Sequence, residues 1–207
     1  MCWFQGEHSK MPWLNKSCIK RWKEINPDWD INLLTSDNIS EYCEDFKSIA
    51  KEKRTLAANS DLLRLLLLSK YGGVWADASV LPIFPLSSFY SKIVNQTEFF
   101  SYRFKPRTLD RETVSWFLCA KNPNNYLINR WRDKFIEIYT ESKHWQKYSI
   151  HKSLSFLYDK DPDIKYIINS MVQISEKIPH SAENDWHKKI DSYMYKRPRW
   201  AEPMGID

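Results

Sequence analysis

Two short groups of polar residues in the first half of the chain have the types and spacing needed to face a ligand in a cleft. Asp61 and Arg64 lie three positions apart in a leucine-rich stretch, so on a helix they share one face and can point together into a cleft. The structural alternative is a surface ion pair worth a few tenths of a kcal/mol. Asp77 and Ser79 alternate along a predicted strand, which gives them the same face as Trp75. An isolated buried Asp77 would cost several kcal/mol, so it should face a cation, a donor group or solvent in a cleft.

The elements that must position these groups follow from the run between Asn59 and Leu81. Ser60 can cap a helix or lie in its first turns, and four leucines form an apolar stripe on it: Leu62, Leu63, Leu66 and Leu67. Gly72 and Gly73 suit a left-handed cap and a tight turn into a strand over residues 74–80. Asp77 then projects from the far end of that strand, the end at which open α/β sheets bind ligands.

The remaining pattern predicts an α/β fold whose second half is mainly helical. Residues 2–4 read as the end of a strand, residues 11–26 as a helix that stops before Pro27, and residues 29–34 as a second strand. Strand, helix and strand in this order open an α/β fold. Residues 124–142 have helical periodicity, and Asp161 with Pro162 is typical of an N-cap and a first helical turn.

The composition excludes several classes of protein. The chain has 207 residues, 43% of them hydrophobic and 28% charged, which predicts one globular domain over residues 1–207. Four cysteines without a CxxC pair argue against structural zinc and an oxidised scaffold, and no leader or membrane-spanning stretch is apparent, so we expect a cytoplasmic location. The net charge of +5 suits an anionic ligand or a peripheral contact with the cytoplasmic face of a membrane. No nucleic-acid-binding signature is present.

The central motif resembles a known family. The runs Ser60 to Arg64, Tyr71 to Trp75 and Asp77 to Ser79 resemble the SDxxR…YGGxxxDxx signature of bacterial-type capsular polysaccharide synthesis proteins. These proteins are similar to glycosyltransferases with a DXD sugar-binding motif, including the glucosylating clostridial toxins. The resemblance extends upstream through residues 18–34 to residues 2–6, and downstream to residues 115–121.

The resemblance implies a Rossmann-like nucleotide-diphospho-sugar transferase fold of the GT-A type. Residues 1–121 would form its nucleotide-sugar-binding α/β part and residues 122–207 a mainly helical acceptor-side part. It implies a hexosyltransferase-like enzyme that moves a sugar from a nucleotide-diphosphate donor to a polysaccharide or lipid-linked glycan, in capsular or extracellular polysaccharide synthesis. Asp61 and Arg64 would contact the transferred sugar, and Asp77 would hold the donor diphosphate and ribose with Mn²⁺ or Mg²⁺.

The resemblance and the charge of the tail suggest roles for residues outside this motif. Trp3 could stack on the base of the donor, with a core anchor as its structural alternative. Lys196, in a basic tail, could neutralise diphosphate charge. We expect the donor side to include Gly73, Ser79 and Lys196, the acceptor side Ser115 and Trp116, and the metal ligands Asp77, Ser79 and His151.

The chain departs from the family pattern at two places. Ser79 stands where many relatives place a second aspartate, and a neutral hydroxyl is a poorer ligand for a hard cation than a carboxylate. Relatives also carry several residues before the position of Met1, so we expect a shortened first strand. Two alternatives therefore stay open: a catalytically silent nucleotide- or glycan-binding protein on the same fold, and a metal-dependent hydrolase that uses Asp77.

Overall fold

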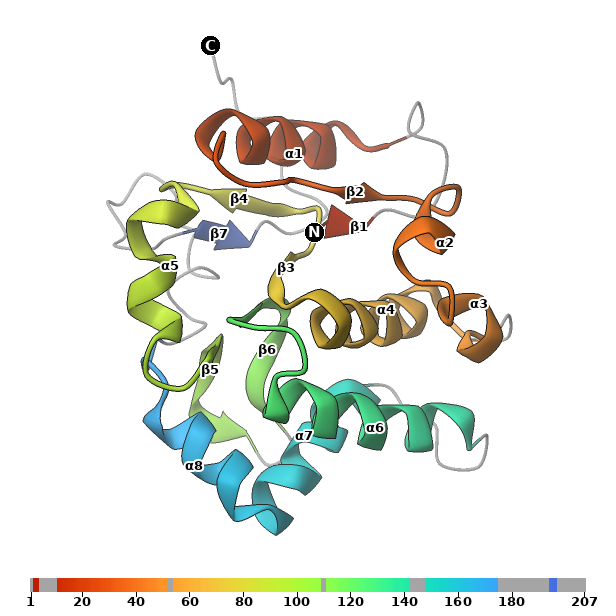
Figure 1. The fold of residues 1–207 in the computed structure, drawn as a ribbon, viewed down its shortest axis with the longest axis vertical. Helices are drawn as coiled ribbons and strands as arrows, with labels where there is room; N and C mark the ends of the chain where they lie inside the picture. Colours follow the sequence, from red (N-terminus) through yellow and green to blue (C-terminus); the bar gives the residue numbers. More distant parts are fainter. Residues whose placement is uncertain are drawn as a thin grey trace.

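Short strands and helices alternate in the first half of the computed structural model, and helices dominate the second half (Figure 1). It describes residues 2–3, 11–51, 54–108, 111–141, 148–174 and 194–196, with the backbone alone for 2–3, 105–108 and 195–196. The strands are β1 (Cys2–Trp3), β2 (Leu33–Leu34), β3 (Gly73–Ala76), β4 (Val80–Pro82), β5 (Phe99–Thr108), β6 (Arg111–Ala120) and β7 (Met194–Lys196). The helices are α1 (Trp13–Ile25), α2 (Ile39–Tyr42), α3 (Phe46–Ile49), α4 (Leu56–Tyr71), α5 (Leu86–Val94), α6 (Tyr126–Thr140), α7 (Ser149–Lys160) and α8 (Pro162–Ser170).

The largest sheet of the described residues is antiparallel, with β6 in the middle between β3 and β5. Ala120 of β6 is opposite Gly73 of β3 on one side and Phe99 of β5 on the other. All four residues of β3, Gly73 to Ala76, are paired with β6. Two smaller sheets flank it: β1 pairs with β2 in parallel, and β4 pairs with β7 in antiparallel fashion. An α/β fold is therefore confirmed. The Rossmann-like arrangement is not, because parallel pairing among the described residues is limited to the two-residue strands β1 and β2.

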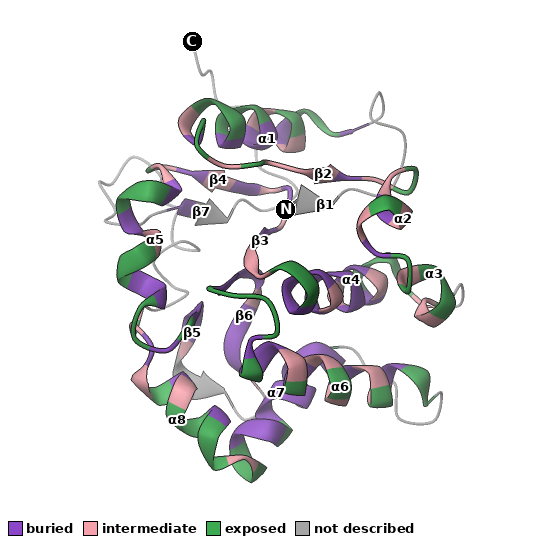
Figure 2. Cartoon of the chain, viewed as in Figure 1, coloured by how far each residue is buried: buried purple, intermediate pink, exposed green. Residues whose placement is uncertain are grey.

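Alternation along β6 divides the core into two layers. Leu118 and Ala120 pack into a cluster with α4, α6, α7 and α8, whereas Phe117 and Cys119 pack into a second cluster with α1 and α5. Successive side chains of a strand point to opposite faces, so one apolar strand serves both layers. Figure 2 shows the buried residues gathered on the inward sides of these helices. The central sheet is thereby held rigidly from both faces.

Two of the three strand predictions in the first half were too long. The strand expected over residues 29–34 is reduced to Leu33–Leu34, because β1 pairs with these two residues alone and a strand needs a neighbour. The strand expected over residues 74–80 is broken after Ala76 by a turn, and β4 begins at Val80. The helices predicted near residues 11–26 and 124–142 are confirmed. Asp161 caps α8 by accepting from the amides of Asp163 and Ile164.

The small sheet of β4 and β7 joins the two parts of the chain. Val80 is opposite Lys196 in this pair, so β7, which belongs to the part expected on the acceptor side, lies against the part expected on the donor side. On its other side β4 is supported by α1, because the indole Nε1 of Trp22 donates to the carbonyl of Val80 at 2.8 Å. The position of Val80, and of the turn that precedes it, is thus fixed from two directions.

Candidate functional site

Helix α4 carries Asp61 and Arg64 on its second and third turns. Its start is fixed by Thr55, whose hydroxyl accepts a hydrogen bond from the amide of Ala58, so Ser60 lies inside the helix rather than at its cap. The leucine stripe differs from the predicted one, because Leu65 and Leu68 are also buried whereas Leu66 is only half-buried. A helix that is apolar nearly all round is packed on several sides, which gives its few polar residues fixed positions.

Two glycines turn the end of α4 into β3. Gly72 and Gly73 have φ values of 66° and 79°, a left-handed conformation that side chains disfavour. A Cβ at Gly72 would lie 2.7 Å from the backbone carbon of Asn122, whereas a Cβ at Gly73 would have no neighbour within 4 Å. The cap and turn predicted from the sequence are therefore confirmed, and Gly72 has a steric reason in addition to its conformation.

Asp77 lies at the first position after β3, where the chain turns towards β4. Its amide donates to the carbonyl of Trp116 at 2.9 Å, and its carbonyl accepts from the amide of Val80 at 2.9 Å. The indole Nε1 of Trp75 donates to Asp77 Oδ1 at 3.1 Å. The shared face of Trp75 and Asp77 is confirmed, but Ser79 lies in a turn rather than on a strand, so strand alternation does not place its hydroxyl.

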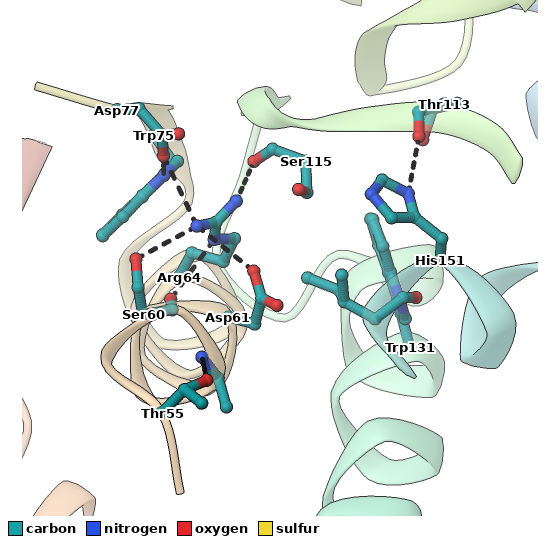
Figure 3. Close-up of polar contacts among 12 residues, drawn as sticks. Thr55, Ser60, Asp61, Arg64, Trp75, Asp77, Thr113, Ser115, Trp131 and His151 are labelled. Atoms are coloured by element: carbon teal, nitrogen blue, oxygen red, sulfur yellow. Dashed lines mark hydrogen bonds and ion pairs between the residues drawn. The ribbon is translucent and has the colours of Figure 1, made fainter. Parts of the chain in front are cut away.

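Arg64 is the centre of the candidate site (Figure 3). It is 4% exposed, and its guanidinium lies 3.2 Å from Asp61 Oδ1 and 3.4 Å from Asp77 Oδ1. It also donates to the carbonyl and hydroxyl of Ser60, at 3.2 and 3.0 Å, and to the carbonyl of Ser115. One buried cation therefore joins α4, the turn after β3 and strand β6. Sequence reasoning identified the two carboxylates, but it missed these contacts with Ser60 and with the carbonyl of Ser115.

The two carboxylates differ in their surroundings. The side chain of Asp61 is 17% exposed and that of Asp77 is 29% exposed. Burial raises the pKa of Asp61 from its ordinary value of 3.8 to about 6; Arg64 opposes this increase and the charge of Asp77 adds to it. With both carboxylates ionised the three charged groups sum to −1. Such a site favours a cation or a hydrogen-bond donor over a bare anion.

The donor-side residues near this centre are placed by the backbone. Gly73 begins β3. Lys196 is opposite Val80, and Val80 lies three positions after Asp77 in the chain. The side chains of Trp3 and Lys196 lie outside the described part of the structure, so stacking by Trp3 and phosphate binding by Lys196 stay predictions.

The two residues predicted on the acceptor side, Ser115 and Trp116, have different surroundings in the structure. Ser115 reaches the centre through its backbone carbonyl, which accepts from Arg64. Trp116 is 7% exposed, and its ring is stacked on Tyr102 with centroids 5.3 Å apart. A ring that is buried against another ring has little surface left for a glycan. The structure therefore gives the Trp116 side chain a packing role.

His151 is held away from the carboxylates. Its Nδ1 lies 3.1 Å from the carbonyl of Thr113, on the opposite side of Figure 3 from Asp77, and the residue is 8% exposed. Within the described residues, no group of three or more His, Cys, Asp or Glu side chains gathers to hold a metal ion. The predicted ligand set of Asp77, Ser79 and His151 is thus not brought together.

A cavity of about 670 Å³ lies at the beginning of β3, next to Gly72, Gly73 and Val74, rather than at its end. Among the described residues, its wall combines aromatic residues with three carboxylates and includes no lysine or arginine: Trp22, Asp28, Trp29, Asp30, Ile31, Asn32, Glu41, Tyr42, Tyr71 and Leu86, with Ala76 of β3. The three carboxylates of this described wall disfavour a bare diphosphate.

The chain belongs to the capsular polysaccharide synthesis protein family, whose profile matches residues 1–200. It is 26% identical to the O-glycosyltransferase braB of Annulohypoxylon truncatum and 22% identical to the O-glycosyltransferase PaGT of Phomopsis amygdali, over 171 residues in each case. These alignments cover 75% of this chain but 40% and 42% of the relatives, so the chain spans about two fifths of their length. Both relatives are fungal, and the bacterial source that the motif suggested stays an expectation.

A solved structure shares the fold. The PaToxG glycosyltransferase superposes with a TM-score of 0.54 over 82% of this chain and 71% of that one, at 15% identity. At this identity the likeness concerns the fold alone. No helix among the described residues is both long and apolar enough to cross a membrane.

Proposed function

We propose that the chain is a glycosyltransferase that moves a sugar from a nucleotide-diphosphate donor to a hydroxyl of a glycan or lipid-linked glycan, in capsular or extracellular polysaccharide synthesis. Family membership and the names of its relatives support the reaction class. The observation that carries the site is Arg64, which is nearly fully buried between Asp61 and Asp77 at the end of β3.

In this reaction the bond from the anomeric carbon to the diphosphate breaks, a bond to the acceptor oxygen forms, and the acceptor proton leaves. Positive charge develops on the sugar and negative charge on the diphosphate, so the site must stabilise both. Asp61 and Arg64 would hold sugar hydroxyls by charge-assisted hydrogen bonds. Because Arg64 is already neutralised by two carboxylates, it cannot by itself balance the departing diphosphate. A second source of positive charge is needed on that side.

The residues present fit a divalent metal that arrives with the donor. Mg²⁺ in transferase sites is commonly held by one or two carboxylates together with substrate phosphates and water. Asp77 remains 29% exposed, and the site has a charge of −1, so it fits Mn²⁺ or Mg²⁺ in this manner. When bound, such an ion would neutralise charge on the diphosphate. Ser79 in the same turn and Lys196 opposite Val80 are the further candidates on the phosphate side.

One observation favours the silent alternative, a protein that binds a nucleotide or glycan without turnover. Arg64 has partners on three elements and is 4% exposed, which is also how a structural brace between a helix and a sheet would look. The two functions differ in turnover. A protein in which Arg64 is only a structural brace would bind the donor but would form no product.

The test measures release of nucleoside diphosphate from a panel of sugar donors, with and without acceptor, in wild type and in Asp77→Asn. The amide keeps an oxygen that can accept from Trp75 but removes the charge that a cation needs. We expect acceptor-dependent release to fall by at least about a hundredfold, or about 2.7 kcal/mol of transition-state stabilisation, with little change in melting temperature. Asp163→Asn, on the exposed first turn of α8, is the matched control.

Three outcomes would contradict the proposal. Release that does not depend on acceptor would indicate a hydrolase. Donor binding by calorimetry without turnover would indicate the silent protein. Full activity of Asp77→Asn in the presence of a chelator would remove the metal and diphosphate role of Asp77.

A further inference from the structure

Helix α1 has an exposed face of one charge sign. The helix contains Lys16, Lys20, Arg21 and Lys23 but a single acidic residue, Glu24. All four basic side chains and Glu24 are exposed, whereas the opposite face buries Leu14, Cys18, Ile19 and Trp22. The net charge of the exposed face is +3 even with Glu24 counted, and Glu24 forms a surface ion pair with Lys20 at 3.7 Å. The face as a whole therefore attracts anions.

An aromatic residue lies on the same face. Trp13 starts α1, is 44% exposed, and is three, seven and ten residues before Lys16, Lys20 and Lys23. Residues with these spacings form one continuous stripe along a helix. Tryptophan has an apolar ring and a polar N–H, a combination that favours the boundary between lipid and water. The stripe thus combines two kinds of membrane-binding group.

Helix α6 does not repeat this pattern. Its exposed surface alternates Arg132 with Asp133 and Lys134 with Glu137, and both pairs are ion pairs at 2.7 Å. The carboxylates that follow α1 in the chain, Asp28 and Asp30, line the cavity beside β3 and add their charge to its wall.

Helix α1 lies at one end of the described part of the molecule, and its exposed residues face outward along its length (Figures 1 and 2). Its inner face is fixed to β4 by the bond from Trp22 to Val80, and β4 continues from the turn that holds Asp77. A membrane that binds α1 would thus bind a helix that is rigidly joined to the candidate site.

We propose that the face formed by Trp13, Lys16, Lys20 and Lys23 binds the surface of an anionic lipid membrane. The attraction is electrostatic and is supplemented by the Trp13 ring, since the apolar face of α1 is already buried in the protein. The surface goes beyond the proposed transferase function, and its test contains no sugar donor. It would hold the chain close to acceptors that are themselves attached to lipid.

The experiment is vesicle co-sedimentation of the whole chain. The vesicles are phosphatidylcholine alone, or phosphatidylcholine with about one third phosphatidylserine, which supplies the anionic surface. Wild type should bind the anionic vesicles at least about tenfold more tightly than the neutral ones, and high salt should abolish the difference. In the triple variant Lys16→Glu, Lys20→Glu and Lys23→Glu, binding to anionic vesicles should fall by at least about a hundredfold, because each of the three basic residues contributes a factor of about five.

The matched control reverses three exposed lysines elsewhere, Lys92→Glu, Lys121→Glu and Lys160→Glu, with the same change in net charge. It should lose less than about threefold, because charges beyond a Debye length of the membrane are screened. Equal losses in both variants would show that net charge alone drives binding and would overturn the proposal. So would equal binding of wild type to both kinds of vesicle. Trp13→Ser tests the ring: it should weaken binding at every salt concentration and leave the salt dependence unchanged. Circular dichroism melts verify that each variant is folded.

Discussion

The raised pKa of Asp61 predicts that this carboxylate destabilises the fold near neutral pH. A pKa of about 6 in place of 3.8 means that ionisation is about 3 kcal/mol less favourable in the folded protein than in the unfolded chain. Between about pH 4 and pH 6 the folded state keeps a proton that the unfolded state has lost, so this contribution to stability falls as pH rises. Above about pH 6 the full destabilisation is present.

The perturbation that isolates this effect is Asp61→Asn, because an amide resembles the neutral carboxyl in size and never ionises. The free energy of unfolding of wild type and variant, from urea titrations, should be similar near pH 4. The variant should become more stable than wild type by up to about 3 kcal/mol near pH 7.5. Transferase activity should fall in the same variant, because the amide cannot supply the charge that sugar binding uses.

The control is Asp133→Asn, on the outer side of α6, where the carboxylate is 58% exposed. Its free energy of unfolding should differ little from that of wild type, because an exposed ion pair such as the one between Asp133 and Arg132 contributes little to stability. The reasoning would be refuted if Asp61→Asn became progressively less stable than wild type as pH rises. That result would mean that the attraction of Arg64 for Asp61 exceeds the desolvation of the carboxylate.

Two further predictions follow from the turn regions. Gly72→Ala should lower the free energy of unfolding by at least about 2 kcal/mol, because its Cβ would meet the backbone of Asn122. Gly73→Ala should lower it by about 1 kcal/mol, because only the backbone conformation opposes the side chain there. Equal losses of the two variants in urea titrations would contradict the steric argument. Ser79→Asp should tighten Mn²⁺ binding measured by calorimetry in the presence of donor, and an unchanged affinity would exclude position 79 from the metal side.

The candidate centre was predictable where local rules decide it. The spacing of Asp61 and Arg64 on one helix face, and the turn at Gly72, depend on neighbouring positions in the chain, and the structure confirms both. The bond from Arg64 to the carbonyl of Ser115 is different, because it joins residues 51 positions apart through a backbone atom that every residue has. No residue type marks such a contact in the sequence.

The prediction of one strand over residues 74–80 was wrong for a related reason. Alternation of small apolar and polar residues between Ala76 and Val80 is compatible with a strand and with a turn. The choice is made by pairing: β6 pairs with β3 as far as Ala76, opposite Phe117, while Val80 is opposite Lys196. Because these partners come from distant segments, the sequence pattern alone could not place the break between the two strands.

The pairing of Val80 with Lys196 also has a consequence for the order in which the protein is made. The two residues are separated by 116 positions, so this contact closes one of the longest loops in the chain. During synthesis the helix with Asp61 and Arg64 leaves the ribosome long before Lys196 does. A nascent chain can therefore form the ion pairs of Arg64 with Asp61 and Asp77 early. In contrast, β4, which follows the Asp77 turn, can pair with β7 only after residue 196 has been made.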